Sequence, residues 1–135
     1  MPVKKTQRTN WWWLLILVLI ITLGGGAYWG CQRANEASAR NAVQTWCNLA
    51  EFPQGRANEK IVTRGGMFTR EFEISFVANP SELGQWIQNS VGLQAAQIET
   101  SGNTTRYTIA PNRAIYCNAE INLQTGDVYI HTAWS

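Results

Sequence analysis

The chain has 135 residues, and its 11 lysines and arginines outnumber its nine acidic residues, which gives a formal net charge of +2 at pH 7. The excess lies before Trp11, in Lys4, Lys5 and Arg8, so the rest of the chain carries eight basic and nine acidic residues. This balance excludes a basic surface for nucleic acid. The length beyond residue 30 suits one small domain and not two.

The first element is an uncharged apolar run from Trp11 to Trp29. As a helix it would be about 28 Å long, close to the thickness of the hydrocarbon core of a bilayer. Tryptophans and a tyrosine at its two ends suit the two headgroup regions. We therefore predict a retained transmembrane helix over residues 11–30, with the lipid bilayer as its partner.

The orientation follows from the basic residues of the tail. Positive charge stays on the cytoplasmic side, so residues 1–10 are predicted to be cytoplasmic and residues 31–135 to be exported. The expected location is the bacterial inner membrane, with the domain in the periplasm or outside the cell. A cleaved secretory signal and a lipoprotein signal cut before Cys31 are the alternatives. The lack of a good Ala-x-Ala site and the bulky Tyr28 and Trp29 favour the retained anchor.

Cys31 is a lone cysteine beside this predicted helix. A thiol here can link two copies of the chain, or the chain and a partner, near the membrane. An unmodified or acylated thiol is the alternative. A homodimer is thus one of the expected assemblies, and Gly26 and Gly30 form a small-xxx-small pair that would let two helices approach.

A second helix is predicted over residues 32–52, because Ala39, Val43, Trp46 and Cys47 fall on one stripe. Cys47 and Cys117 are predicted to form a disulfide, since an exported domain folds in an oxidising compartment. Two buried free thiols are the alternative.

Strand patterns follow a polar loop at residues 54–60. Residues 61–78 alternate, with Phe68, Phe72, Ile74 and Phe76 on one face and a turn or bulge at Gly65 and Gly66. Arg70 interrupts the apolar face. It is interpreted either as an edge residue reaching water or as a buried cation that contacts an acidic ligand.

The segment Asn79-Pro80-Ser81-Glu82 predicts the start of a helix, which ends near Gly92. Two hairpins are then predicted over residues 96–110 and 114–134, with turns at 101–103 and 124–127. The fold class is therefore α+β: a transmembrane helix, then an antiparallel sheet of about four to five strands covered on one face by two helices.

Few residues suggest chemistry, and the chain is predicted not to be an enzyme and to need no cofactor. His131 lies one residue off the apolar register of its strand, so it is expected at the surface, and a hydrolase that uses it with Glu120 or Cys117 is a minor alternative. One histidine without Cys-x-x-Cys or His-x-x-x-His spacing disfavours a zinc site. Glu71 and Glu73 share a solvent face with Glu120.

The leading functional hypothesis is a membrane-anchored, non-catalytic accessory protein that contacts a protein partner in a membrane or envelope assembly. Tyr116, Tyr129, Trp134 and Cys31 are its candidate interaction residues. The alternative is a tethered domain that binds a small ligand or an envelope polymer on a concave sheet face between the two helices, with Arg70 as a candidate ligand contact.

Overall fold

The protein is described by a computed structural model that covers residues 11–66 and 68–135. The predicted cytoplasmic tail lies outside the described residues. The chain divides into two compact units, residues 1–35 and residues 36–135, and each is described by itself.

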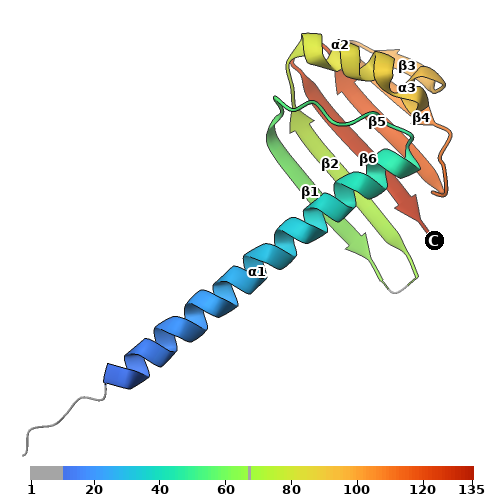
Figure 1. Cartoon of the computed structure of the whole chain (residues 1–135). Helices are drawn as coiled ribbons and strands as arrows, with labels where there is room; N and C mark the ends of the chain where they lie inside the picture. Colours follow the sequence, from blue (N-terminus) through green and yellow to red (C-terminus); the bar gives the residue numbers. More distant parts are fainter. Residues whose placement is uncertain (1–10, 67) are drawn as a thin grey trace, which may run out of the picture. The chain divides into compact units, whose positions relative to one another are not determined.

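The first element is helix α1, Trp11–Trp46, whose apolar N-terminal part is long enough to cross a membrane once (Figure 1). The helix predicted over residues 32–52 is part of α1 and ends earlier than predicted. Cys47 and Asn48 form a turn, in which Asn48 adopts a left-handed backbone conformation with φ of 51°. A left-handed residue at this position ends the helix and turns the chain toward the sheet.

The second unit contains a six-stranded antiparallel sheet in the order β1-β2-β6-β5-β4-β3. Its strands are β1 (Ala57–Gly65), β2 (Arg70–Val77), β3 (Gln97–Ser101), β4 (Thr104–Ile109), β5 (Tyr116–Asn122) and β6 (Asp127–Trp134). An antiparallel sheet of about four to five strands was predicted, and the structure has six. Residues 57–60, predicted as loop, extend β1 because they pair with the end of β2.

In the tight hairpin between β1 and β2, Phe68 was predicted to face the core, and the structure shows that it does not. Gly65 has a φ of 127°, and a Cβ there would lie 2.1 Å from the Thr69 carbonyl oxygen, so the turn needs glycine. Phe68 follows in the turn and is 77% exposed instead of packing with Phe72. Ile115 and Leu123, at the ends of the β5 pattern, are likewise exposed.

Helices α2 (Pro80–Asn89) and α3 (Val91–Gln94) connect β2 to β3. The predicted N-cap is confirmed, because the Asn79 side chain accepts a hydrogen bond from the Ser81 backbone N–H. The helix ends at Asn89, before the predicted Gly92, and the chain continues into α3. The Glu82 carboxylate lies beside Gly55.

The core of the second unit lies between one face of the sheet and the helices. Every second residue along the central strands faces this core. The helices α1, α2 and α3 contribute Val43, Leu83, Trp86 and Leu93. The helices cover only part of this face, because Ile98 of β3 is 58% exposed. Cys47 and Cys117 form the predicted disulfide within this core, with Cα atoms 5.7 Å apart.

Candidate functional site

The opposite face of the sheet, called here the open face, has no helix of residues 36–135 over it (Figure 1). The strands alternate between the two faces, so residues of the other parity project from it. Those used below are Arg64, Glu71, Glu73, Ser75, Arg106, Tyr116, Asn118, Glu120, Tyr129 and His131. They are half-buried or exposed, whereas their neighbours along β2, β5 and β6 alternate into the core.

A cluster of ionisable side chains forms where β2 and β6 pair. His131 lies directly opposite Glu73 in the ladder, and Glu71 lies two residues before Glu73 on the same face. The His131 Nε2 atom lies 2.9 Å from the Tyr116 hydroxyl and within hydrogen-bond distance of the Glu71 carboxylate. Ligand atoms of Glu71, Glu73 and His131 all lie within 4.8 Å of one another.

Two tyrosines border this cluster as neutral hydroxyl groups. Burial raises the pKa of Tyr116, and the negative charges of Glu71 and Glu73 add to the increase. Burial also raises the pKa of Tyr129, and the negative charge of Glu73 adds to the increase. Their phenols therefore stay protonated at neutral pH and offer both an apolar ring and a polar hydroxyl.

Two arginines on the open face pair with glutamates. Arg64 Nη1 lies 2.7 Å from the Glu73 carboxylate, and Arg106 Nη2 lies 2.7 Å from the Glu120 carboxylate. The arginines are mostly exposed, so each pair remains accessible to water. Such pairs contribute little to stability and can rearrange for a partner.

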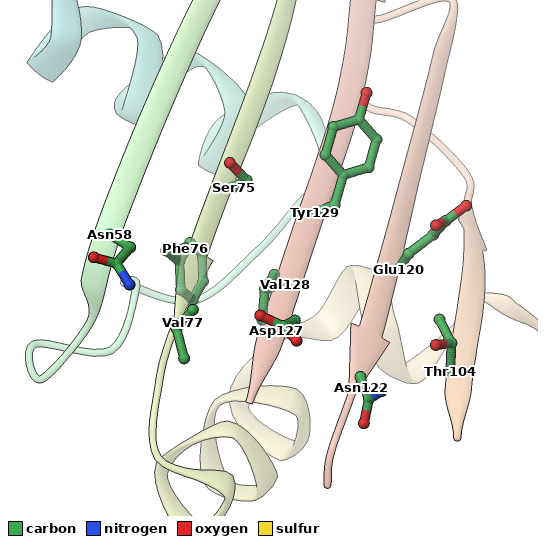
Figure 2. A pocket seen from close by; sticks show the side chains of 10 residues that line it. All are labelled: Asn58, Ser75, Phe76, Val77, Thr104, Glu120, Asn122, Asp127, Val128 and Tyr129. Atoms are coloured by element: carbon green, nitrogen blue, oxygen red, sulfur yellow. The ribbon is translucent and has the colours of Figure 1, made fainter. Parts of the chain in front are cut away.

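Two hollows on the open face border Tyr129. The Tyr129 hollow has a volume of 360 Å³ and is lined mainly by polar side chains of five strands, including Asn58, Ser75, Thr104, Glu120 and Tyr129 (Figure 2). The His131 hollow has a volume of 410 Å³ and lies between Glu99, Arg106, Asn118 and His131. Both are shallow and polar, unlike the enclosed apolar pockets that bind small molecules.

The structure brings only some of the predicted site residues together. Tyr116 and Tyr129 lie on the open face beside His131. Trp134 and Arg70 are paired at the end of the β2–β6 ladder, on the same side of the sheet as the core residues. Trp134 is 41% exposed. Cys31 is exposed in α1, within the first unit.

Several alternatives are corrected by the structure. Arg70 is exposed, so the buried cation is wrong, and the sheet face under the helices is filled by the core. Cys117 is disulfide-bonded on the covered face, so it forms no pair with His131, whereas Glu120 pairs with Arg106 and lines the same hollow as His131. The association of His131 with Glu71 and Glu73 was not predicted. Alternation along one strand predicts that Glu71 and Glu73 share a face, but it does not predict which strand lies next to them.

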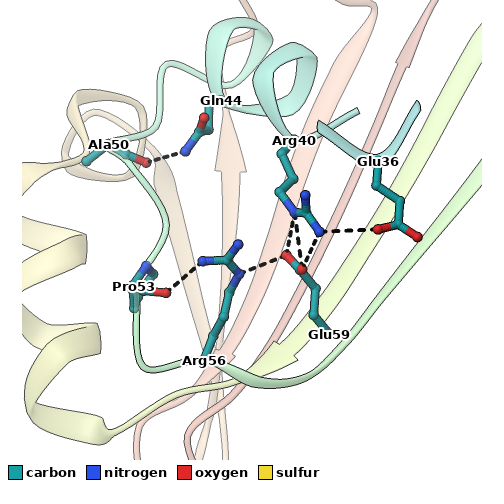
Figure 3. Close-up of polar contacts among 7 residues, drawn as sticks. All are labelled: Glu36, Arg40, Gln44, Ala50, Pro53, Arg56 and Glu59. Atoms are coloured by element: carbon teal, nitrogen blue, oxygen red, sulfur yellow. Dashed lines mark hydrogen bonds and ion pairs between the residues drawn. The ribbon is translucent and has the colours of Figure 1, made fainter. Parts of the chain in front are cut away.

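A further polar cluster lies away from the open face and joins the domain part of α1 to β1. Arg40 donates hydrogen bonds to both oxygens of the Glu59 carboxylate at 2.7 to 3.1 Å, and Arg56 donates to it at 2.8 Å (Figure 3). Arg40 also pairs with Glu36. All these groups have partners, so we assign the cluster a structural role.

Replacing Glu59 by glutamine is expected to reduce the free energy of unfolding by about 1–2 kcal/mol at pH 7, because charge-assisted hydrogen bonds to two guanidinium groups are weakened. Burial raises the pKa of Glu59, but the hydrogen bonds and charges of Arg40 and Arg56 outweigh it and hold that pKa below its ordinary value of 4.5. A carboxyl whose pKa is lower in the folded state than in the unfolded state stabilises the fold at pH values above its unfolded-state pKa. This stability is lost as the pH falls through the folded-state pKa.

Denaturant unfolding at pH 7 and at a series of acidic pH values measures both effects. The Glu59→Gln variant should lose less stability on acidification than the unmodified chain. Glu120→Gln is the matched control, since its pair with Arg106 is exposed and should change stability by no more than about 0.5 kcal/mol. Equal acid sensitivity of the Glu59→Gln variant and the unmodified chain would contradict the assignment.

Comparisons with protein-family models, with curated proteins and with solved structures find no match. The function is therefore argued from the open face itself.

Proposed function

We propose that this is a membrane-anchored, non-catalytic accessory protein that binds a second exported protein through the open face of its sheet. The observation that carries the proposal is the asymmetry of the sheet. One face holds the core, and the other presents Tyr116, Tyr129 and ionisable groups without a helix of residues 36–135 over them.

The composition of the open face supports a protein partner. Tyrosine and arginine are enriched in protein interfaces, because each combines contact area with hydrogen-bonding groups. Tyr129 is 37% exposed and stands between the two hollows, which makes it the candidate anchor. The shallow polar hollows match the relief of a protein surface better than they match a small apolar ligand.

The anchor defines the setting of this interaction. The apolar part of α1 suits a single membrane crossing, and the basic residues of the tail favour an orientation with the domain outside the cytoplasm. A protein held on the membrane meets its partner at high effective concentration, so an interface of modest affinity is sufficient. The partner is expected in the same membrane or in the adjoining envelope space.

Site-specific photo-crosslinking in native membranes tests the proposal. A photoreactive amino acid at position 129 should give one defined crosslinked protein, which mass spectrometry identifies. The same amino acid at the exposed position 88 of α2 is the matched control and should not give that product. Tyr116→Ala should reduce the yield at position 129, because it removes contact area beside the anchor.

The outcomes separate the two binding hypotheses. A crosslink to the same protein with equal yield from position 88 would contradict docking on the open face. A protein that purifies alone in mild detergent, without crosslinks from position 129, would reject the accessory role and favour the envelope-polymer alternative. The Tyr129 hollow, with polar groups around an aromatic ring, is where such a polymer would bind.

A further inference from the structure

We propose that Glu71, Glu73 and His131 bind a divalent transition metal ion of the zinc class on the open face. Two carboxylates and one imidazole come from adjacent strands, and their ligand atoms lie within 4.8 Å of one another. The β2–β6 register creates this set, because His131 is paired with Glu73 and Glu71 is on the same side two residues away. The proposal is independent of the protein partner.

The donor set fits zinc chemistry. Zn²⁺ takes histidine nitrogen and carboxylate oxygen at about 2.0–2.2 Å, which places tetrahedral ligand atoms about 3.4 Å apart. The present ligand atoms lie within 4.8 Å of one another, so binding would require the three side chains to rotate until their spacing reaches that value. An imidazole ligand favours a transition metal over Ca²⁺ or Mg²⁺, which prefer oxygen ligands throughout.

The orientation of His131 gives a second reason. Its Nε2 atom points toward the Glu71 carboxylate and the Tyr116 hydroxyl, not away from the cluster. The contact needs a hydrogen or a cation between Nε2 and the carboxylate, and a divalent ion in place of that hydrogen would also offset the charge of the second carboxylate, Glu73.

The surroundings determine how tightly an ion is held. The three side chains are 18% to 32% exposed, so an ion reaches them without unfolding. Arg64 competes for Glu73, but its side chain is 60% exposed and can turn into solvent. The Tyr116 hydroxyl lies 2.9 Å from the same Nε2 atom, so an ion bound there would take the place of this hydrogen bond.

Three protein ligands leave a coordination position open. The His131 hollow lies beside the cluster and admits water to the ion. An open position on a three-ligand site is typical of zinc that exchanges a ligand, whereas structural zinc sites are closed by four protein ligands. We therefore infer an exchangeable ion and not one on which folding depends.

The test uses the full-length chain in detergent, prepared without a polyhistidine tag because that tag binds the same metals. Co²⁺ titration should produce visible absorption bands with a stoichiometry of one, and Zn²⁺ should remove them. His131→Asn and Glu73→Gln should each weaken binding by at least about tenfold. Glu120→Gln, a carboxylate of the same face outside the cluster, should bind like the unmodified chain.

Arg64→Ala provides a test in the opposite direction and does not depend on deleting a ligand. Removal of the competing cation should tighten metal binding several-fold. Unfolding curves of each variant show whether it is folded. The proposal is overturned if the unmodified chain shows no saturable Co²⁺ band, if His131→Asn binds with unchanged affinity, or if Arg64→Ala weakens binding.

Discussion

Replacing Gly92 by alanine is expected to lower the free energy of unfolding by about 3 kcal/mol, the upper part of the usual range for overpacking. A Cβ at Gly92 would lie 1.9 Å from the Cys47 carbonyl oxygen and 3.1 Å from the Asn48 carbonyl oxygen. Both neighbours are backbone atoms in the turn that ends α1, so neither can rotate away. The Gly92 backbone N–H donates to the Asn48 oxygen at 2.8 Å, and the substitution would break this contact.

Denaturant unfolding of the full-length chain in detergent measures the loss. Gly84→Ala is the matched control: Gly84 lies within α2 with nothing within 4 Å of an added Cβ. Alanine there should be neutral or should stabilise by up to about 1 kcal/mol, because alanine is the better helix former. If the two variants had the same stability, the close approach of α3 to the turn would be refuted.

Removing the disulfide is expected to have the larger effect. The bridge closes a loop with a sequence separation of 70, and the chain-entropy model gives about 4 kcal/mol for a loop of that length. It also ties the end of α1 to β5 at two fully buried residues, Cys47 and Cys117. The double replacement by alanine should therefore lower the melting temperature strongly, or prevent folding at growth temperature.

Melting with and without reductant separates the covalent effect from packing. Reductant should lower the melting temperature of the unmodified chain toward that of the double variant, whose own melting temperature should not respond. Cys31→Ser is the control, since Cys31 is exposed and outside the bridge. A melting temperature that is unaffected by reductant would show that the bridge contributes no stability.

Local signals in the sequence predicted much of the fold. The apolar run predicted the N-terminal part of α1, and the Asn79 cap predicted the start of α2. The turn residues between the later strands predicted both hairpins within a few residues. Each of these signals is short-range, because capping, turn geometry and helix periodicity are set by neighbours along the chain.

Features that depend on distant parts of the chain were missed or only partly predicted. Residues 57–60 are polar and lack a clear alternation, and they form strand because β2 offers them a partner. The end of α1 at Trp46 was also not predicted, because the turn at Cys47 and Asn48 that follows it contacts Gly92, a residue distant in the sequence. The cluster at His131 depends on β2 and β6 being neighbours, which no local pattern indicates.

The sheet order also determines when this domain can fold. The β1–β2 hairpin and the β3–β4–β5 meander have no ladder between them except through β6, which pairs with β2 on one side and β5 on the other. A ribosome adds about 5–20 residues per second, so the β1–β2 hairpin, which ends at Val77, is made roughly 3–10 seconds before β6 is complete. Of the six strands, β6 is synthesised last, so the sheet is completed only when β6 joins the two halves.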